Sequence, residues 1–352
     1  MPRSVVPIAR TCIRTAHATM RSVPDNTLST LLSLCAADAL GAATEFKTPE
    51  VIQARYALPF DHYQEGSVFG FAPGEATDDS QMTVATLLGY ARGEGTSGVW
   101  KALQDWLAAG PPDVGSLTGA ALRRAGPDGG VHAWEASNFH SAGNGGLMRV
   151  AAAWIAGFRD EALARESAVL TALTHADPRC VHASVALTAC MEALSSGASY
   201  TDAATHSLRV MNALNAEAVL MDAGLFSSTT LRAHRAFRER DREARAAVSS
   251  RVRAGLDGVL TSQSGFVLDT LEAALKHASA ASWLACVQPA VLLGDDSDTV
   301  ACVVGALAGA RGLPVPEPLL PPLRLGHSWP GWHREWLCLD HLPGIVQAAR
   351  QG

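Results

Sequence analysis

The chain has 352 residues, of which 48% are hydrophobic and 18% are charged, and 28 Lys and Arg against 34 Asp and Glu give a formal net charge of −6. This composition excludes a disordered chain, because such chains are poor in apolar residues and rich in charge of one sign. The mild acidity, with a pI near 6.0, argues against a nucleic acid or an anionic membrane as the main partner. The length allows one large domain or two ordinary ones.

The first 24 residues form a basic segment that contains no acid and four arginines: Arg3, Arg10, Arg14 and Arg21. Such a composition suits a transit peptide, but the segment lacks the continuous apolar stretch of a secretory signal. We therefore predict a disordered extension over residues 1–24, and Met20 offers an alternative start.

From Asp25 onward the apolar residues recur at helical spacing, and Asp25, Asn26 and Thr27 offer N-cap side chains before the first run. Further helices are predicted over residues 79–90, 99–108, 146–157, 159–174, 181–194, 201–214, 267–277, 281–291 and 299–310. No run of alternating β-branched residues occurs. The pattern predicts an all-α bundle and not an α/β sheet.

Glycine-rich and proline-rich breaks interrupt these runs at residues 93–98, 111–113, 126–130 and 195–199. None is long enough for a domain linker, so we predict a single domain over residues 25–352. Residues 232–245 alternate Arg with Asp and Glu, which favours a solvated helix face over a site for an anionic partner.

The C-terminal tail, from about residue 313, is rich in proline, and we expect its prolines to stop helix formation. The tail also contains Trp329, Trp332 and Trp336, so we expect it to pack back across the bundle.

The seven cysteines are widely spaced, mostly within apolar runs, and form no C-x-x-C motif. They indicate reduced core residues of an intracellular protein, and we expect a cytoplasmic location. No stretch reaches the roughly 18 consecutive apolar residues of a membrane span, so no membrane partner is expected.

Two acidic clusters directly precede apolar helical runs: residues 77–80 (TDDS) and residues 295–299 (DDSDT). One interpretation is that both are N-caps, since Asp, Ser and Thr satisfy the free N–H groups at a helix start. A cap needs only one oxygen, however, and the five carboxylates would repel one another if the clusters met without a cation. Mg²⁺ takes such oxygen ligands. The absence of H-E-x-x-H and of Cys/His groupings argues against zinc.

A glycine-rich loop, residues 143–149 (GNGGLMR), leads into another apolar run. Such a loop lets backbone N–H groups approach a phosphate, although a purely structural turn is the alternative.

Asp38 lies in the middle of an apolar helix and needs a partner, a metal or a proton. Glu45 comes at the end of that helix, where its pKa would be raised and would suit a proton carrier; the alternative is an exposed Glu at a fraying end.

Six motifs occur in this order: D-A-L-G…E, T-D-D-S, G-N-G-G-L-M-R, T-H-A-D-P, S-G-F-V-L-D-T-L-E-A-A-L and D-S-D-T-V-A. From about residue 38 to about residue 312, this set resembles the ADP-ribosylglycohydrolase family, which includes dinitrogenase reductase-activating glycohydrolase and ADP-ribosylarginine hydrolase. The resemblance implies a compact orthogonal helical bundle with two Mg²⁺ ions, or Mn²⁺, at the bottom of a cleft.

The resemblance also implies roles for individual residues. The metal ligands would be Thr77, Asp78, Asp79, Asp296, Asp298 and Thr299. Substrate binding would fall to Asn144, Gly145, Gly146, Leu147, Met148, His175, Ser264, Gly265 and Phe266. Catalytic roles would fall to Glu45 and Asp296, with Glu45 placed near the attacking water or the leaving group.

The chain departs from the family pattern at four positions, Ala37, Asp177, Phe266 and Asp295, and we expect Asp177 and Asp295 to change the charge of the cleft. The expected function is hydrolysis of the N- or O-glycosidic bond between ADP-ribose and a protein side chain. Arginine is the favoured acceptor, and the protein is expected to act as a monomer. The alternative is a catalytically silent member that binds ADP-ribose or serves a structural role, but the intact ligand set favours the enzyme.

Overall fold

The computed structural model describes residues 25–352, so the extension predicted over residues 1–24 lies outside the described residues. The described chain contains sixteen α-helices, one 3-10 helix and two strands of two residues each. In chain order the elements are α1 (Thr27–Gly41), α2 (Pro49–Arg55), β1 (Glu75–Ala76), α3 (Asp78–Tyr90), α4 (Gly95–Ala108), α5 (Ser116–Leu122), α6 (Gly129–Ala136), α7 (Ala151–Ile155), α8 (Asp160–Ala172), α9 (Pro178–Ser195), α10 (Tyr200–Ala213), α11 (Ala216–Asp222), α12 (Leu231–Leu256), α13 (Val267–His277), α14 (Trp283–Val291), α15 (Ser297–Ala310), η1 (Glu317–Leu319), β2 (Arg324–Leu325) and α16 (Cys338–Ala349). The all-α prediction is confirmed.

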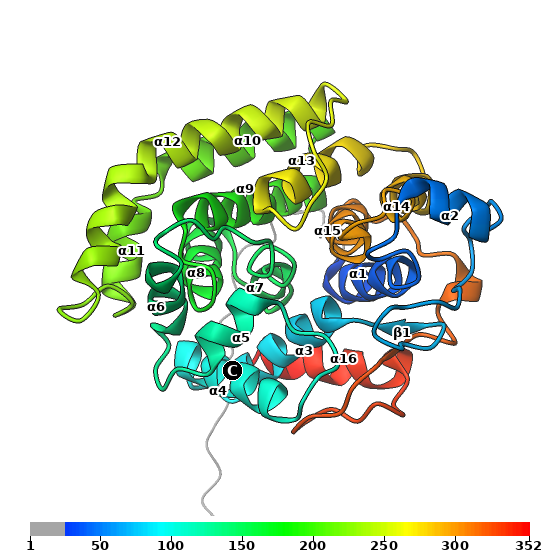
Figure 1. The fold of residues 1–352 in the computed structure, drawn as a ribbon, viewed down its shortest axis with the longest axis horizontal. Helices are drawn as coiled ribbons and strands as arrows, with labels where there is room; N and C mark the ends of the chain where they lie inside the picture. The colour runs from blue at the N-terminus through cyan, green and yellow to red at the C-terminus, as the bar shows by residue number, and fades with distance from the viewer. Residues whose placement is uncertain (1–24) are drawn as a thin grey trace, which may run out of the picture.

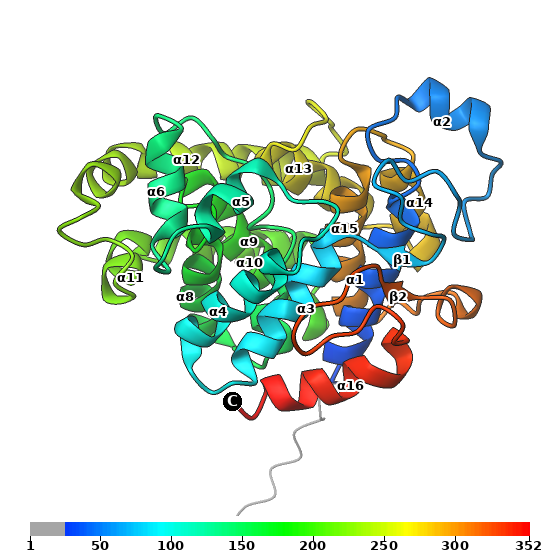
Figure 2. The ribbon, with the colours of Figure 1, turned by 60° about the horizontal axis from the view of Figure 1, so that its bottom comes forward.

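Helices α1 and α15 lie side by side and are covered by other helices on several sides (Figure 1). Helix α12 runs across the same view while α15 is seen nearly end-on, so the helices cross at steep angles. Helix α2 and the loop after it project from the body, and α16 covers the opposite edge (Figure 2). The strands β1 and β2 pair in parallel and tie the start of α3 to the C-terminal region.

The close contact between α1 and α15 depends on small residues. A Cβ atom on Gly305 would lie 2.7 Å from the Cβ atom of Ala37 and 2.7 Å from the carbonyl oxygen of Ser33. A Cβ atom on Gly41 would lie only 2.4 Å from the Cα atom of Asp298. Because real side-chain atoms do not approach this closely, both positions need glycine. The contact brings the end of α1 against the start of α15.

The helix predicted over residues 146–157 is much shorter, because only Ala151–Ile155 is helical and residues 145–150 before it form turns. Glycine is a poor helix former, and these turns begin with two glycines. The tail prediction was also wrong in one respect. Helix formation resumes at Cys338 despite Pro343, since Leu342, Ile345 and Val346 form a buried apolar face. Packing of the tail is confirmed, with Trp329 and Trp332 buried.

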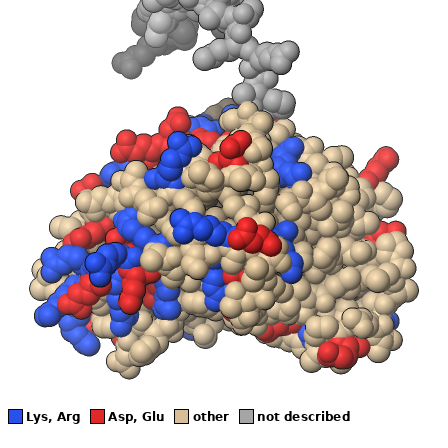
Figure 3. Space-filling view, turned by 90° about the horizontal axis from the view of Figure 1, so that it is seen from above, with Lys and Arg blue, Asp and Glu red and all other residues tan. Residues whose placement is uncertain are grey.

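Four helices of seven or eight residues were not predicted: α2, α5, α6 and α11. They are too short for the apolar period to be read from the sequence. The charged segment over residues 232–245 belongs to α12, in which Arg235 pairs with Glu239 at 2.8 Å on the exposed side while Phe237 is buried. Basic and acidic side chains intermingle on this face (Figure 3), which confirms the solvated helix face.

Six cysteines lie within the described residues, and all six are free and buried, as the sequence predicted. Among residues 25–352, no helix combines the length and the apolar character needed to cross a membrane.

Replacing Gly305 by Ala tests the contact between α1 and α15. The new methyl group would meet Ala37 and the Ser33 carbonyl at 2.7 Å, so we expect the free energy of unfolding to fall by about 1–3 kcal/mol. Urea denaturation measures this change. The matched control is Gly344→Ala in α16, where an added Cβ atom meets nothing within 4 Å; this variant is expected to keep or gain stability by up to about 1 kcal/mol. Equal stability of the two variants would contradict the packing argument.

Candidate metal centre and substrate cavity

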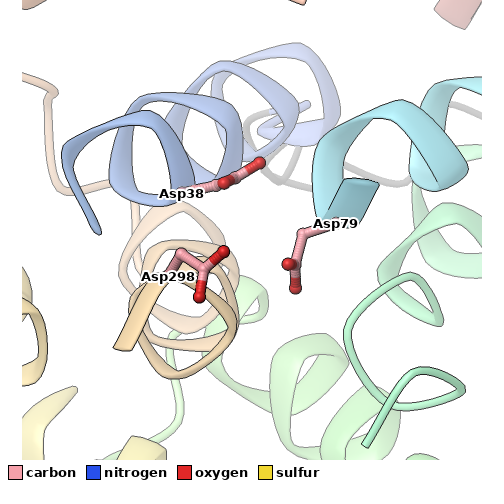
Figure 4. Close-up of side chains that lie close together, drawn as sticks. All are labelled: Asp38, Asp79 and Asp298. Carbon is pink, nitrogen blue, oxygen red and sulfur yellow. The ribbon is translucent and has the colours of Figure 1, made fainter. Parts of the chain in front are cut away.

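The two acidic clusters meet in the fold. Asp38, Asp79 and Asp298 offer carboxylate oxygens that all lie within 4.8 Å of one another. They come from α1, α3 and α15 and reach into the space between these helices (Figure 4). A second group of the same kind consists of Glu45, Asp296 and Asp298. Asp298 belongs to both groups, so the two groups are adjacent.

Asp38 holds the start of α3 in place from the neighbouring helix α1. Its carboxylate accepts hydrogen bonds from the backbone N–H of Thr77 at 3.0 Å and of Ser80 at 3.1 Å, and from the Thr77 hydroxyl at 2.8 Å. An anion at a helix N-terminus complements the free N–H groups and the helix dipole. Burial raises the pKa of Asp38 to about 6, although the hydrogen bonds from Ser80 and Thr77 act in the opposite direction. The sequence required a partner for Asp38, and α3 supplies it.

The N-cap interpretation of the two clusters is wrong for their side chains. Thr77 and Asp296 are the N-cap residues of α3 and α15, but neither side chain accepts a capping hydrogen bond. Instead, the Thr77 hydroxyl donates to Asp38, and a carboxylate oxygen of Asp296 accepts from the Asn144 side-chain amide at 2.6 Å. These oxygens are therefore directed towards the other acids and the cavity.

Burial and mutual repulsion perturb the acids strongly. The pKa values of Asp78, Asp79 and Asp298 lie well above the ordinary value, first because the groups are buried and then because neighbouring carboxylates repel their charge. Burial and next the Asp298 charge raise the pKa of Glu45 to about 11. The acids cannot all be ionised together unless positive charge is supplied.

Three buried carboxylate oxygens in the centre have no hydrogen-bond partner: Glu45 Oε2, Asp79 Oδ1 and Asp298 Oδ1. Leaving such atoms unsatisfied is costly. Hard divalent cations bind carboxylate and hydroxyl oxygens and favour the ionised acids. The donor set and its unsatisfied atoms therefore fit Mg²⁺ or Mn²⁺.

A cavity of about 260 Å³ adjoins the acidic centre. It is lined by Glu45, Phe46, Asp78, Asp113, Gly115, Ser116, Leu117, Thr118, Gly143, Asn144, Gly145, Met148, His175, Gly265, Asp296, Asp298 and Thr299. Five carboxyl groups thus face a single small space. Thr77 and Asp79, two of the expected ligands, lie behind this lining and are completely or almost completely buried.

The structure brings the expected substrate-binding segments together. The backbone N–H of Asn144 donates to the carbonyl of Gly265 at 3.1 Å, and Gly143 forms an antiparallel bridge with Phe266. Gly145 lies tightly against His175, because a Cβ atom there would be 2.8 Å from the His175 Cε1 atom.

Four of the expected substrate residues do not line the cavity: Gly146, Leu147, Ser264 and Phe266. Leu147 belongs to the apolar core. The Ser264 hydroxyl donates to Asp269 at 2.7 Å, and the Phe266 ring carries the Arg179 guanidinium 5.4 Å from its centroid.

The Glu45 side chain is only 3% exposed, so the alternative of an exposed residue at a fraying helix end is wrong. The structure also corrects the expectation for Asp177. It caps α9, pairs with Arg179 at 2.8 Å and accepts from Trp134 at 3.0 Å, so it does not line the cavity and its charge is compensated.

Asp295 does not line the cavity either. Its backbone joins the segment after Glu45 to the start of α15 by two hydrogen bonds. Phe46 N–H donates to the Asp295 carbonyl at 2.7 Å, and Asp295 N–H donates to the Lys47 carbonyl at 3.0 Å. Both Phe46 and Asp295 adopt positive φ angles, 54° and 53°. The charge of Asp295 still contributes to the raised pKa of Asp296, after burial.

Asp113 and Phe46, an acid and an aromatic residue of the cavity, were not predicted from the sequence as site residues. Asp113 follows two prolines and was assigned only to a break in the helical pattern. Burial raises its pKa to about 6. The only sequence signal was a single acid in a turn, which carries little information. Phe46 lines the cavity and is 60% exposed, which the sequence did not indicate.

The sequence and the fold of the chain resemble those of known proteins. The sequence model of the ADP-ribosylglycohydrolase family matches residues 19–340. A curated relative, the ADP-ribosyl-[dinitrogen reductase] glycohydrolase of Rhodospirillum rubrum, is 34% identical over 131 residues, which is 36% of this chain and 43% of the relative. A solved structure described as an ADP-ribosylglycohydrolase-related protein complex shares the fold, with a TM-score of 0.67 and 22% identity over 94% of this chain and 99% of that chain.

The chain therefore belongs to the ADP-ribosylglycohydrolase family, whose members are glycosidase-type hydrolases. The match spans less than half the length of the curated relative. The family assignment confirms the resemblance noted in the sequence, while the roles of individual residues stay predictions.

The acidic centre predicts that Mg²⁺ stabilises the protein more at neutral pH than at acid pH. The folded-state pKa values of Asp38 and Asp113, about 6, exceed the ordinary 3.8, so without metal their contribution to stability falls as pH rises through that interval. Cations bind the ionised acids and compensate this loss. Thermal unfolding in chelator and in saturating Mg²⁺, from about pH 4 to pH 7, measures the difference.

Asp298→Asn should abolish the Mg²⁺-dependent rise in Tm, since Asp298 belongs to both groups of acids. The matched control is Asp340→Asn, an exposed acid in the first turn of α16, which should keep the effect. A Tm that does not respond to Mg²⁺ in the wild type would contradict a metal centre.

Proposed function

We propose that the protein hydrolyses the glycosidic bond between ADP-ribose and a protein side chain, with arginine as the preferred acceptor. One observation carries the proposal: five carboxyl groups face a small cavity that is closed on another side by the glycine loop and His175. Cleavage of such a bond develops positive, oxocarbenium-like charge on the ribose, which carboxylates stabilise.

The expected ligands Thr77, Asp78, Asp79, Asp296, Asp298 and Thr299 would hold two Mg²⁺ or Mn²⁺ ions. Two adjacent groups of acids that share Asp298 support two cations rather than one. When bound, the cations would orient the ribose hydroxyls and lower the pKa of a bound water. An anionic diphosphate also needs this positive charge to enter a cavity lined by carboxylates.

We assign proton transfer to Glu45. Its carboxyl group lines the cavity beside Asp296 and Asp298, within reach of a leaving group or an attacking water, and burial raises its pKa when no cation is bound. Asp296 is held by the Asn144 amide at 2.6 Å and has a fixed orientation at the cavity wall. Asn144 therefore acts on the acidic centre as well as on the substrate.

The charge of the cavity supports arginine as the acceptor. The leaving group from an arginine conjugate is a guanidine, which becomes cationic when protonated, whereas the leaving group from a serine conjugate is neutral. Asp113 lines the cavity, is not one of the expected metal ligands and, with a pKa raised by burial to about 6, would attract the cationic group when ionised at neutral pH. A serine conjugate would gain nothing from this acid.

The wider setting of this activity stays a prediction. The name of the Rhodospirillum rubrum relative gives dinitrogen reductase as the ADP-ribosylated protein on which that relative acts. For this chain we propose an ADP-ribosylated protein as substrate. The single domain over residues 25–352, the monomeric state and the cytoplasmic location also stay predictions.

The test is release of ADP-ribose from peptides that carry it on arginine or on serine. We expect faster release from arginine, loss of release in chelator and recovery with Mg²⁺. Glu45→Gln should lower kcat by about a hundredfold or more, because it removes an acid without changing shape. Asp298→Asn should abolish turnover, with the helical circular dichroism signal retained, whereas Asp340→Asn should be fully active. No release from either peptide would leave the alternative, a silent member that binds ADP-ribose or serves a structural role.

A further inference from the structure

Arg149 is a completely buried arginine whose partners are all neutral. No ion pair in the described part of the chain includes it. Its guanidinium donates to the carbonyl of Gly145, to the carbonyl of Leu170 at 3.0 Å and to the hydroxyl of Thr174 at 2.7 Å. A buried charge without an opposite charge is costly, so stability does not account for this residue. Its contacts link the glycine loop to the segment that carries His175.

The Thr174 hydroxyl connects Arg149 to His175 by two hydrogen bonds. The hydroxyl oxygen lies 2.8 Å from His175 Nδ1. A guanidinium can only donate hydrogen bonds, so this oxygen accepts from Arg149 and its single proton is free to point at Nδ1. In the opposite arrangement, with Nδ1–H donating to the hydroxyl, the buried hydroxyl proton would have no partner, which is unfavourable.

Nε2 of His175 is then the nitrogen that carries the proton of the neutral ring. Burial, and next the charge of Arg149, lower the pKa of His175 to about 3, so the ring stays neutral at working pH. His175 lines the cavity, and within residues 25–352 no hydrogen-bond partner occupies Nε2. Because residue 145 is glycine, no side chain of the loop covers Nε2 at this point; a Cβ atom there would lie only 3.2 Å from it.

We propose that Arg149 and Thr174 are positioning residues that lock His175 in its Nε2–H form, so that the ring presents a permanent N–H donor to an oxygen of the ADP-ribose group in the cavity. The identity of the ligand rests on the proposed function; the locked form of the ring does not. The same guanidinium holds the Gly145 carbonyl, so one buried residue orients both the glycine loop and the segment that carries His175.

The first test reads the ring directly and needs no activity. In protein labelled with ¹⁵N at histidine, a long-range ¹H–¹⁵N spectrum at neutral pH distinguishes the two neutral forms, and His175→Gln identifies the His175 signals by their loss. We expect only the Nε2–H form in the wild type and in Thr174→Ser, which keeps the hydroxyl. Thr174→Val removes the hydroxyl without changing shape and should give a mixture of both forms.

The matched control is Thr171→Val. Thr171 lies one helical turn earlier, is completely buried, and its hydroxyl has no partner, so this variant should keep the locked form. A wild-type ring in the Nδ1–H form would overturn the proposal without any variant. A single Nε2–H form in a folded Thr174→Val would overturn it as well.

The second test measures the affinity for ADP-ribose by calorimetry in Mg²⁺. Loss of a fixed donor to a charged or hydroxyl oxygen should weaken binding about tenfold in Thr174→Val. Thr174→Ser and Thr171→Val should bind like the wild type. Unchanged affinity in a folded Thr174→Val would overturn the positioning role. If the wild type shows only the Nε2–H form but does not bind ADP-ribose, the positioning of His175 by Arg149 and Thr174 is supported and the proposed function is wrong.

Discussion

The mutual repulsion of buried carboxylates, gathered where three helices meet, is the constraint on which the rest of the structure depends. Asp38 and Asp298 are close because Gly41 and Gly305 let α1 and α15 touch. Asp79 joins them because Asp38 holds the start of α3 through backbone and hydroxyl hydrogen bonds. Apolar helices thus carry an acidic centre that they cannot neutralise themselves, and three of its carboxylate oxygens are left without hydrogen-bond partners.

That constraint connects the centre with the cavity beside it. A cavity lined by carboxyl groups repels an anionic substrate unless cations are present, and its acids hold protons that a hydrolytic reaction can use. The opposite wall provides the balancing features: the glycine loop, Asn144 and a neutral histidine. Arg149, buried behind this wall, orders it through Gly145 and Thr174. Acid, donor and cation sites therefore arise from contacts between segments far apart in the sequence.

The sequence predicted the features that depend on local pattern. The helix over residues 267–277 was predicted with its exact ends, because its apolar period is strong and its borders are sharp. Both acidic clusters and the glycine loop were also found, because each is a short run of characteristic residues that can be seen in the sequence itself. Three features were not predicted: the capping of α3 by Asp38, the hydrogen bonds that link Arg149 through Thr174 to His175, and the presence of Asp113 in the cavity. Each of them depends on a contact between distant segments. The family model confirmed the resemblance, but it does not test these individual contacts.

The most direct measurement of the central claim is the number of Mn²⁺ ions bound per chain, read by titration with electron paramagnetic resonance detection of free Mn²⁺. We expect two ions per wild-type chain, displaced by excess Mg²⁺, and loss of both in Asp298→Asn because this residue belongs to both groups of acids. Asp340→Asn should bind two. A wild-type chain that binds no Mn²⁺ would show that the buried acids are not a metal centre.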